Sequence, residues 1–145
     1  MKKKTIAVLF GGCSSEYGIS LNSGYAVLAN MDREKYQPIA IGITKDGRWL
    51  RYDGDLEKIR TDLWHKDESQ CTPAYILPDR DIHGMMEIRG GAPVYTRLDG
   101  VFPVLHGANG EDGAIQGLLQ IAGIPYVGPH IAASAACMDK CMTKL

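Results

Sequence analysis

A histidine and two carboxylates share one glycine-rich stretch near the middle of the chain. His106 follows an uncharged apolar run that begins at Val101, and Gly107 comes directly after it. We expect His106 at the carboxyl edge of a buried strand, where open α/β sheets bind ligands. An imidazole there can donate to a carboxylate or a phosphate, or transfer protons near neutral pH. The alternative is a histidine that only satisfies a local carbonyl. The glycine-rich loop favours the ligand-facing interpretation.

The two acids of this stretch, Glu111 and Asp112, precede a helical pattern. Acidic side chains at the start of a helix cap free N–H groups and complement the helix dipole. We therefore expect both to act as supports. A direct role with substrate is the minor alternative, and they can also orient His106.

A third acid, Glu16, follows Gly11-Gly12 at the end of another apolar run. Two interpretations stay open, a helix cap and a partner for the ammonium group of a ligand, which partial burial strengthens. Ser14, Ser15 and Ser20 have no nearby base, so we interpret them as caps or ligand hydroxyls and not as nucleophiles.

The remaining reactive side chains show no constellation. Lys140 and Lys144 are spaced to share a helix face, where they either hold phosphate or are simply solvated. The other histidines stay unassigned. The cysteines lack the spacing of a zinc site, so we expect no metal and reduced, buried or half-buried thiols, with Cys137 and Cys141 neighbours on a helix.

Two strand–glycine–acid–helix units must position these residues. A buried strand over Thr5–Phe10 precedes a helix from about Glu16 to Met31. The second unit is a strand from Val101, the loop, and a helix with Ile115, Leu118, Leu119 and Ala122 on one face.

The segments between and after these units carry weaker patterns. We expect strands over Tyr36–Thr44, Arg48–Tyr52 and Ile124–Val127, a helix over Leu56–Leu63 with Leu56, Ile59 and Leu63 on one face, a polar loop over Trp64–Gln70, and a helical run over Met138–Leu145. Short strands over Ala74–Leu77, Met85–Ile88 and Pro93–Arg97 predict an antiparallel meander beside the main sheet. Alternating strands and helices predict a three-layer α/β fold with a mainly parallel sheet and a small antiparallel excursion.

Composition excludes several classes of protein. The chain has 145 residues, of which 45% are hydrophobic and 23% charged, as expected for one globular domain. Sixteen basic residues against seventeen acidic ones give no reason to expect a nucleic acid or a membrane as partner. No apolar run is long enough for a signal sequence or a membrane span, so we expect a cytoplasmic protein.

Three motifs resemble one enzyme family. HGANGEDGAIQG, from His106 to Gly117, resembles the first signature of D-alanine–D-alanine ligases. FGGCSSEYGISLNSGYAV, Phe10 to Val27, is similar to the family's N-terminal G-G-x-S-x-E motif, and ASAACMDK, Ala133 to Lys140, is similar to its S-A-x-x-M-D-K motif. The segment from Ile43 to Leu98 looks more like the vancomycin-resistance type. Glu16-Tyr17 leans towards the D-alanine–D-serine ligases.

The resemblance implies the N-terminal, Rossmann-like domain of an ATP-grasp ligase over residues 1–137, with residues 138–145 starting the link to further domains. Such an enzyme uses ATP and Mg²⁺ to join D-alanine to D-alanine or D-serine for peptidoglycan, through an acyl phosphate. By resemblance Glu16 binds the ammonium of the first D-alanine, His106 lies beside its carboxylate, Ile19 and Gly107 shape the subsite, and Lys140 reaches the ATP phosphates.

The helical pattern stops in mid-course at Leu145, so we expect a piece of a longer protein. The resemblance implies that the family's central and C-terminal domains are missing from this piece, so that it is inactive by itself and binds no cofactor alone, and that it pairs as a homodimer. The alternatives are a non-catalytic dimerisation or ligand-binding module and the N-terminal domain of another ATP-grasp ligase. The sequence departs from the family pattern at Gly18, Ile19 and Gly24.

Overall fold

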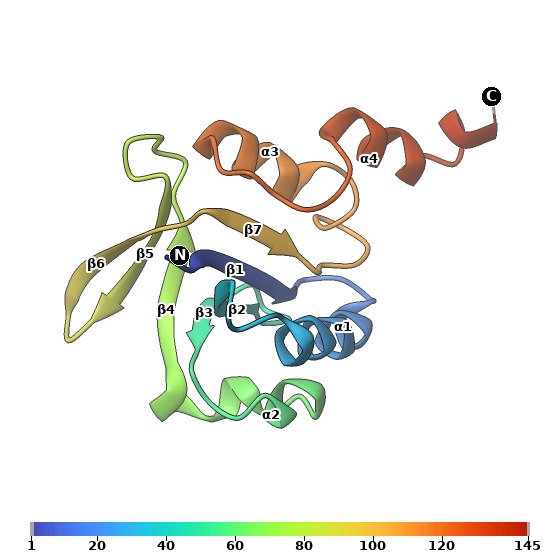
Figure 1. Ribbon diagram of the computed structural model, residues 1–145. Helices are drawn as coiled ribbons and strands as arrows, with labels where there is room; N and C mark the ends of the chain where they lie inside the picture. The colour runs from blue at the N-terminus through green and yellow to red at the C-terminus, as the bar shows by residue number, and fades with distance from the viewer. Residues whose placement is uncertain (1, 145) are drawn as a thin grey trace.

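The computed structural model describes residues 2–144, which form an α/β domain (Figure 1). Its elements are β1 (Lys4–Gly11), α1 (Tyr17–Asn30), β2 (Tyr36–Ile43), β3 (Trp49–Tyr52), α2 (Glu57–Arg60), η1 (Trp64–Lys66), η2 (Glu68–Gln70), β4 (Cys71–Ile76), β5 (Gly84–Arg89), β6 (Ala92–Arg97), β7 (Gly100–Pro103), α3 (Ala114–Ala122), α4 (Ile131–Met138) and η3 (Met142–Lys144). Within this range no helix is both long and apolar enough to cross a membrane.

All seven strands belong to one sheet in the order β6-β5-β4-β3-β2-β1-β7. β1 pairs in parallel with β2 and with β7, whereas the pairings from β2 out to β6 are antiparallel. The expectation of a meander beside the main sheet was wrong on this point. β4 pairs with β3 at one end and β5 at the other, so the meander continues the sheet. Short turns such as Lys45–Gly47 allow only antiparallel neighbours.

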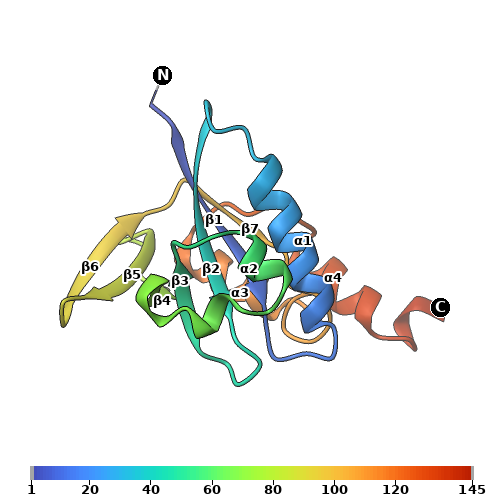
Figure 2. The same ribbon diagram turned by 90° about the horizontal axis from the view of Figure 1, so that it is seen from below.

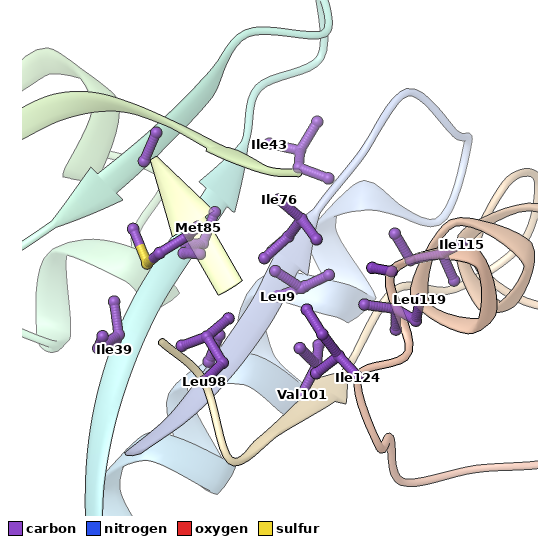
Figure 3. Close-up of a cluster of buried hydrophobic side chains, with 14 of the residues drawn as sticks. Leu9, Ile39, Ile43, Ile76, Met85, Leu98, Val101, Ile115, Leu119 and Ile124 are labelled. Carbon is purple, nitrogen blue, oxygen red and sulfur yellow. The ribbon is translucent and has the colours of Figure 1, made fainter. Parts of the chain in front are cut away.

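Helices cover both faces of the parallel strands, which confirms the three layers. Figures 1 and 2 show α1 and α2 on one face, with α3 on the other. Along β1, Ala7 and Leu9 face the α3 side, and Val8 and Phe10 face the α1 side. On the α3 side Leu9 belongs to a buried cluster with Val101 and Leu119 (Figure 3). A fully buried side chain of this size stabilises the fold by about 1.5–3 kcal/mol, and β1 contributes such side chains to the cores on both faces of the sheet.

The segment expected to be a helix and a polar loop is packed differently. α2 is a single turn, and Leu63 is 46% exposed, so it does not share a buried face with Ile59. Trp64, expected in a loop, is 0% exposed. Its ring lies against Gly42, where a Cβ would come within 2.3 Å of it, and edge-on to Phe10 at 5.1 Å between centroids. The 3₁₀ turns η1 and η2 take the place of the expected loop over Trp64–Gln70. The Trp64 indole supplies the buried apolar surface that the short α2 lacks.

The last third of the chain also differs from expectation. Residues 124–127 form only an isolated bridge between Val101 and Tyr126. α4 ends at Met138 because Asp139 is extended and its carboxylate accepts the N–H groups of Cys141 and Met142, which starts a new turn. The expected helix over 138–145 is therefore wrong, and Leu145 lies outside the described residues. Cys137 and Cys141 share no helix and are exposed, as is Cys13, so these three thiols are not buried.

Candidate functional site

The carboxyl ends of β1 and β7 are tied together by a buried serine. Ser20, on α1, is 0% exposed. Its hydroxyl accepts the N–H of Gly11 at 2.8 Å and donates to the carbonyl of Val104 at 2.5 Å. Ser20 was expected to cap a helix or contact a ligand, but its buried hydroxyl is used by these two backbone groups. It fixes instead the distance between the two strand ends from which the glycine-rich loops leave.

A second serine joins the two loops themselves. The Ser14 hydroxyl donates to the carbonyl of His106 at 2.7 Å, across 92 sequence positions, and accepts the N–H of Glu16 at 3.1 Å. Ser14 therefore holds the backbone of Glu16 beside that of His106. The pattern of capping residues contained no sign of this long-range contact.

Glu16, His106 and Glu111 converge at this junction. One ligand-type atom from each side chain lies within 4.8 Å of the others. The His106 Nδ1 atom lies 3.7 Å from Glu111 Oε1, and His106 Nε2 lies 3.2 Å from the hydroxyl oxygen of Ser23. Glu16 occupies the N-cap position of α1 but makes no side-chain capping bond. The geometry thus argues against the capping interpretation of Glu16 and leaves its carboxylate free for a ligand.

The two neighbouring acids have separate roles. Asp112 accepts the N–H groups of Asn109 and Ala114 at 2.8 and 3.1 Å, and these hydrogen bonds, chiefly that of Asn109, hold its pKa below the ordinary value. Asp112 therefore supports the loop and the start of α3, as expected. Glu111 accepts the N–H of Gly107 at 2.9 Å and lies beside His106. Glu111 therefore matches the expectation that it orients His106, and not the expectation that it caps a helix.

Gly107 allows the loop to approach α1 closely. Its φ is +72°, and a Cβ there would lie 3.3 Å from the Ser14 hydroxyl oxygen and 3.4 Å from Glu16 Oε1. A side chain would be strained in this left-handed conformation and would crowd the Glu16 carboxylate. Gly107 thus shapes the site by being small.

The other predicted site residues lie further out. Ile19, in the first turn of α1, is 54% exposed. Lys140 is exposed in the turn between α4 and η3, a segment that extends away from the sheet in Figure 1. The structure therefore gathers Glu16, His106, Gly107 and Glu111 but does not bring Lys140 to them.

Tyr17, next to Glu16, faces away from the site and anchors α1. Its hydroxyl donates to Asp62 at 2.8 Å and accepts the indole N–H of Trp64 at 3.2 Å. Burial, followed by the hydrogen bond to Asp62, raises the pKa of Tyr17 well above its ordinary value. Tyr17 therefore stays neutral and fixes the position of the helix that carries Glu16 and Ser23.

A crevice of about 310 Å³ opens at the same sheet edge. Gly12, Leu105 and Ile115 are among the residues that line it. A larger cavity of about 600 Å³ lies at the opposite edge, by Lys4 and Gly100, where β1 and β7 begin. This cavity lies where β1 and β7 begin, whereas Glu16, His106 and Glu111 follow the carboxyl ends of these strands, on the side of the smaller crevice. Two carboxylates and an imidazole beside a crevice are suited to bind a small cationic or zwitterionic ligand.

Sequence comparison places most of the chain in one family. Residues 5–129 match the family model described as D-ala D-ala ligase N-terminus. The chain is 46% identical over 144 residues to a D-alanine--D-alanine ligase of Caldicellulosiruptor bescii, covering 99% of this chain and 38% of the relative. It is also 46% identical over 140 residues to the vancomycin B-type resistance protein VanB of Enterococcus faecalis, covering 97% of this chain and 39% of that protein.

Solved structures show the same similarity. The VanG D-Ala:D-Ser ligase from Enterococcus faecalis superposes with a TM-score of 0.91 at 45% identity, over 97% of this chain and 40% of that one. The D-alanine-D-alanine ligase from Coxiella burnetii gives a TM-score of 0.84 at 36% identity, over 99% of this chain and 40% of that one. The chain thus spans about two fifths of the length of these relatives.

Proposed function

The chain belongs to the D-alanine–D-alanine ligase family, and we propose that it forms the binding site for the first D-alanine in an ATP-dependent ligase that makes a peptidoglycan precursor. The observation that carries this proposal is the convergence of Glu16 and His106 from the ends of two neighbouring parallel strands. The family match favours this function over the N-terminal domain of a different ATP-grasp ligase.

The charges of the site suit an amino-acid zwitterion. The Glu16 carboxylate, half-buried and without a side-chain capping bond, pairs with the ligand's ammonium group. Such charge-assisted hydrogen bonds are stronger than neutral ones. His106 lies beside the ligand's carboxylate. Its Nε2 atom lies 3.2 Å from the Ser23 hydroxyl oxygen, and its Nδ1 atom faces Glu111 at 3.7 Å.

The proposed reaction depends on positioning more than on a protein nucleophile. ATP, when bound, supplies the phosphoryl group that activates the D-alanine carboxylate for attack by the second amine. Glu16 keeps the first amine bound by its charge, so that it does not compete as a nucleophile. Gly107 leaves room for the small D-alanine side of the site, and by family resemblance Ile19 shapes the same subsite. By family resemblance, Lys140 contacts the ATP phosphates.

The converging side chains do not fit the Mg²⁺ ion that accompanies ATP. Mg²⁺ takes an octahedral set of oxygen ligands, whereas this group includes an imidazole and is the one candidate metal cluster within residues 2–144. We therefore assign no Mg²⁺ ligand to these residues.

The second substrate is proposed more broadly, as D-alanine or D-serine. One structural relative is titled a D-Ala:D-Ser ligase. The Tyr17 that suggested the D-serine group is buried against Asp62 and Trp64. Its influence on specificity would therefore act through the position of α1.

A chimeric enzyme tests the proposal. In it, this chain replaces the matching two fifths of the Enterococcus faecalis VanG ligase. We expect the chimera to join D-alanine to a second amino acid with release of phosphate. A chimera that folds but shows no turnover would overturn the proposed function.

Glu16→Gln in the chimera isolates the ammonium contact. Loss of a hydrogen bond to a charged group costs about 1.5–3 kcal/mol, so the KM for the first D-alanine should rise roughly 10- to 100-fold. His83→Asn, in a distant loop with φ +47°, is the matched control. An unchanged KM for Glu16→Gln would remove the role given to this residue.

A further inference from the structure

We propose that Glu16, His106 and Glu111 also form a binding site for a divalent transition-metal ion of the Zn²⁺ class. This would regulate the site described above, since an ion there takes the place that the proposed function gives to the ammonium group. The competition between the ion and the ammonium group rests on the proposed function, whereas the binding of the ion does not.

The spacing of the donor atoms matches zinc. Zinc binds imidazole nitrogen and carboxylate oxygen at about 2.0–2.2 Å in a tetrahedron, which separates neighbouring ligand atoms by about 3.3–3.6 Å. His106 Nδ1 and Glu111 Oε1 lie 3.7 Å apart, and all three donors lie within 4.8 Å of one another. A side-chain adjustment of about an ångström at Glu16 completes three corners. The fourth corner stays open towards solvent, as in zinc sites that take an exogenous ligand.

Contacts with Ser23 and with the Gly107 N–H hold His106 and Glu111 in the orientation that a metal requires. His106 Nε2 lies 3.2 Å from the Ser23 hydroxyl oxygen, which leaves Nδ1 to face the carboxylates. Glu111 Oε2 accepts the Gly107 N–H at 2.9 Å, which leaves Oε1 facing His106. Ligands of zinc sites are typically oriented in this way by hydrogen bonds from the atoms that do not touch the metal.

The charge and the donor types select the ion. Two carboxylates balance the charge of a divalent cation, and an imidazole that ligates a metal adds none. Among the contacts within residues 2–144, neither Glu16 nor Glu111 forms an ion pair with a lysine or an arginine. An imidazole ligand favours Zn²⁺ over Mg²⁺ or Ca²⁺. The spacing of the cysteines predicted no zinc site, and the site proposed here contains no cysteine.

Zinc titration calorimetry on the 145-residue chain tests the site. All four cysteines are first changed to serine, because Cys13 in the neighbouring loop offers a competing thiolate. We expect one Zn²⁺ per chain and no comparable uptake of Mg²⁺. His106→Ala and Glu111→Gln should each weaken Zn²⁺ binding at least about 10-fold, whereas the control His83→Asn should leave it unchanged.

Co²⁺ absorption provides the second measurement. A tetrahedral cobalt spectrum that His106→Ala abolishes, while circular dichroism shows the variant folded, supports the site. Absence of Zn²⁺ binding to the cysteine-free chain, or binding that survives His106→Ala, overturns it. Neither result bears on the D-alanine site, because no amino-acid substrate is present.

Discussion

At the scale of single residues, two hydroxyls and two acids build the site in ways that depend on their distant partners. Ser20 and Ser14 both join the β1 side to the β7 side. Glu111 turns towards His106, and Asp112 turns towards the backbone of its own loop. Glu111 and Asp112 are adjacent and both acidic, yet they have different roles.

Ser20→Ala should destabilise the chain. It leaves the Gly11 N–H and the Val104 carbonyl buried beside Ser20 without this partner, and an unsatisfied buried group costs about 1–3 kcal/mol. Urea unfolding of the variant should show a free energy of unfolding lower by about 2–4 kcal/mol. Ser69→Ala, at an exposed hydroxyl, is the control and should change little. A Ser20→Ala variant as stable as the parent would contradict the role of this hydroxyl.

Asp112→Asn should destabilise the chain in a pH-dependent way. The folded-state pKa of Asp112 lies below its unfolded value, because backbone N–H groups stabilise the charged form. The contribution of Asp112 to the free energy of unfolding is therefore present above its unfolded pKa of about 3.9. It is lost as the pH falls through the folded-state pKa.

We expect Asp112→Asn to lower the free energy of unfolding at neutral pH by about 1 kcal/mol, because the amide keeps only one acceptor oxygen for the two N–H groups of Asn109 and Ala114. The difference from the parent should shrink as the solution is made acidic. The control Asp81→Asn, at an exposed side chain, should change the free energy of unfolding little at neutral pH. A difference that does not depend on pH would contradict the charged capping role.

At the scale of elements, α1 is the part that positions the site. It carries Ser20 and Ser23, begins beside Glu16 and is anchored through Tyr17 to Asp62 and Trp64. The helix also lies against β1 at Gly24, where a Cβ would come within 2.6 Å of Phe10 Cβ. Gly18, in the first turn, has open space around it.

A matched pair of glycine substitutions in α1 tests this packing. Gly24→Ala forces the helix away from β1, and overpacking of this kind costs about 1–3 kcal/mol. Gly18→Ala meets nothing within 4 Å and should stabilise the helix by up to about 1 kcal/mol. Thermal unfolding of both variants measures the difference. A stabilising Gly24→Ala would show that α1 does not pack closely on β1.

At the scale of the whole molecule, the site occupies one edge of the sheet and is open to solvent. The chain covers 38% of the Caldicellulosiruptor bescii relative and 40% of the Enterococcus faecalis VanG chain. Within residues 2–144 the converging groups are proposed to bind and orient an amino acid, and as a set that includes an imidazole they do not fit Mg²⁺. We therefore interpret the site as half of a substrate subsite.

These 145 residues by themselves should release no phosphate from ATP in the presence of D-alanine. The expected rate is that of the background, because binding and orientation without phosphoryl-group stabilisation leave most of the barrier in place. A phosphate-release assay measures it, with the chimera as the positive control. Clear turnover by the chain alone would contradict the half-site interpretation.

We also propose a homodimer through this domain. Sedimentation velocity should give a dimer of the 15.8 kDa chain at micromolar concentration. A monomer over the whole accessible concentration range would contradict it.

The local pattern of residues determined the class of the fold and the two loops of the site. Uninterrupted apolar runs predict buried strands, and the 3.6-residue spacing after Gly113 predicts α3, because both depend on neighbours a few positions away. The same local reasoning placed Glu16 and His106 at strand ends, and parallel strands bring such ends to one edge.

The tertiary structure decided what depends on contacts between distant segments. The hydroxyls of Ser14 and Ser20, the burial of Trp64 against Gly42 and the joining of the meander to β3 all involve partners far away in sequence. A serine or a tryptophan has the same local signature wherever its partner lies. Only the packed sheet determines which backbone group or apolar surface it meets, and so whether Glu16, His106 and Glu111 form one site.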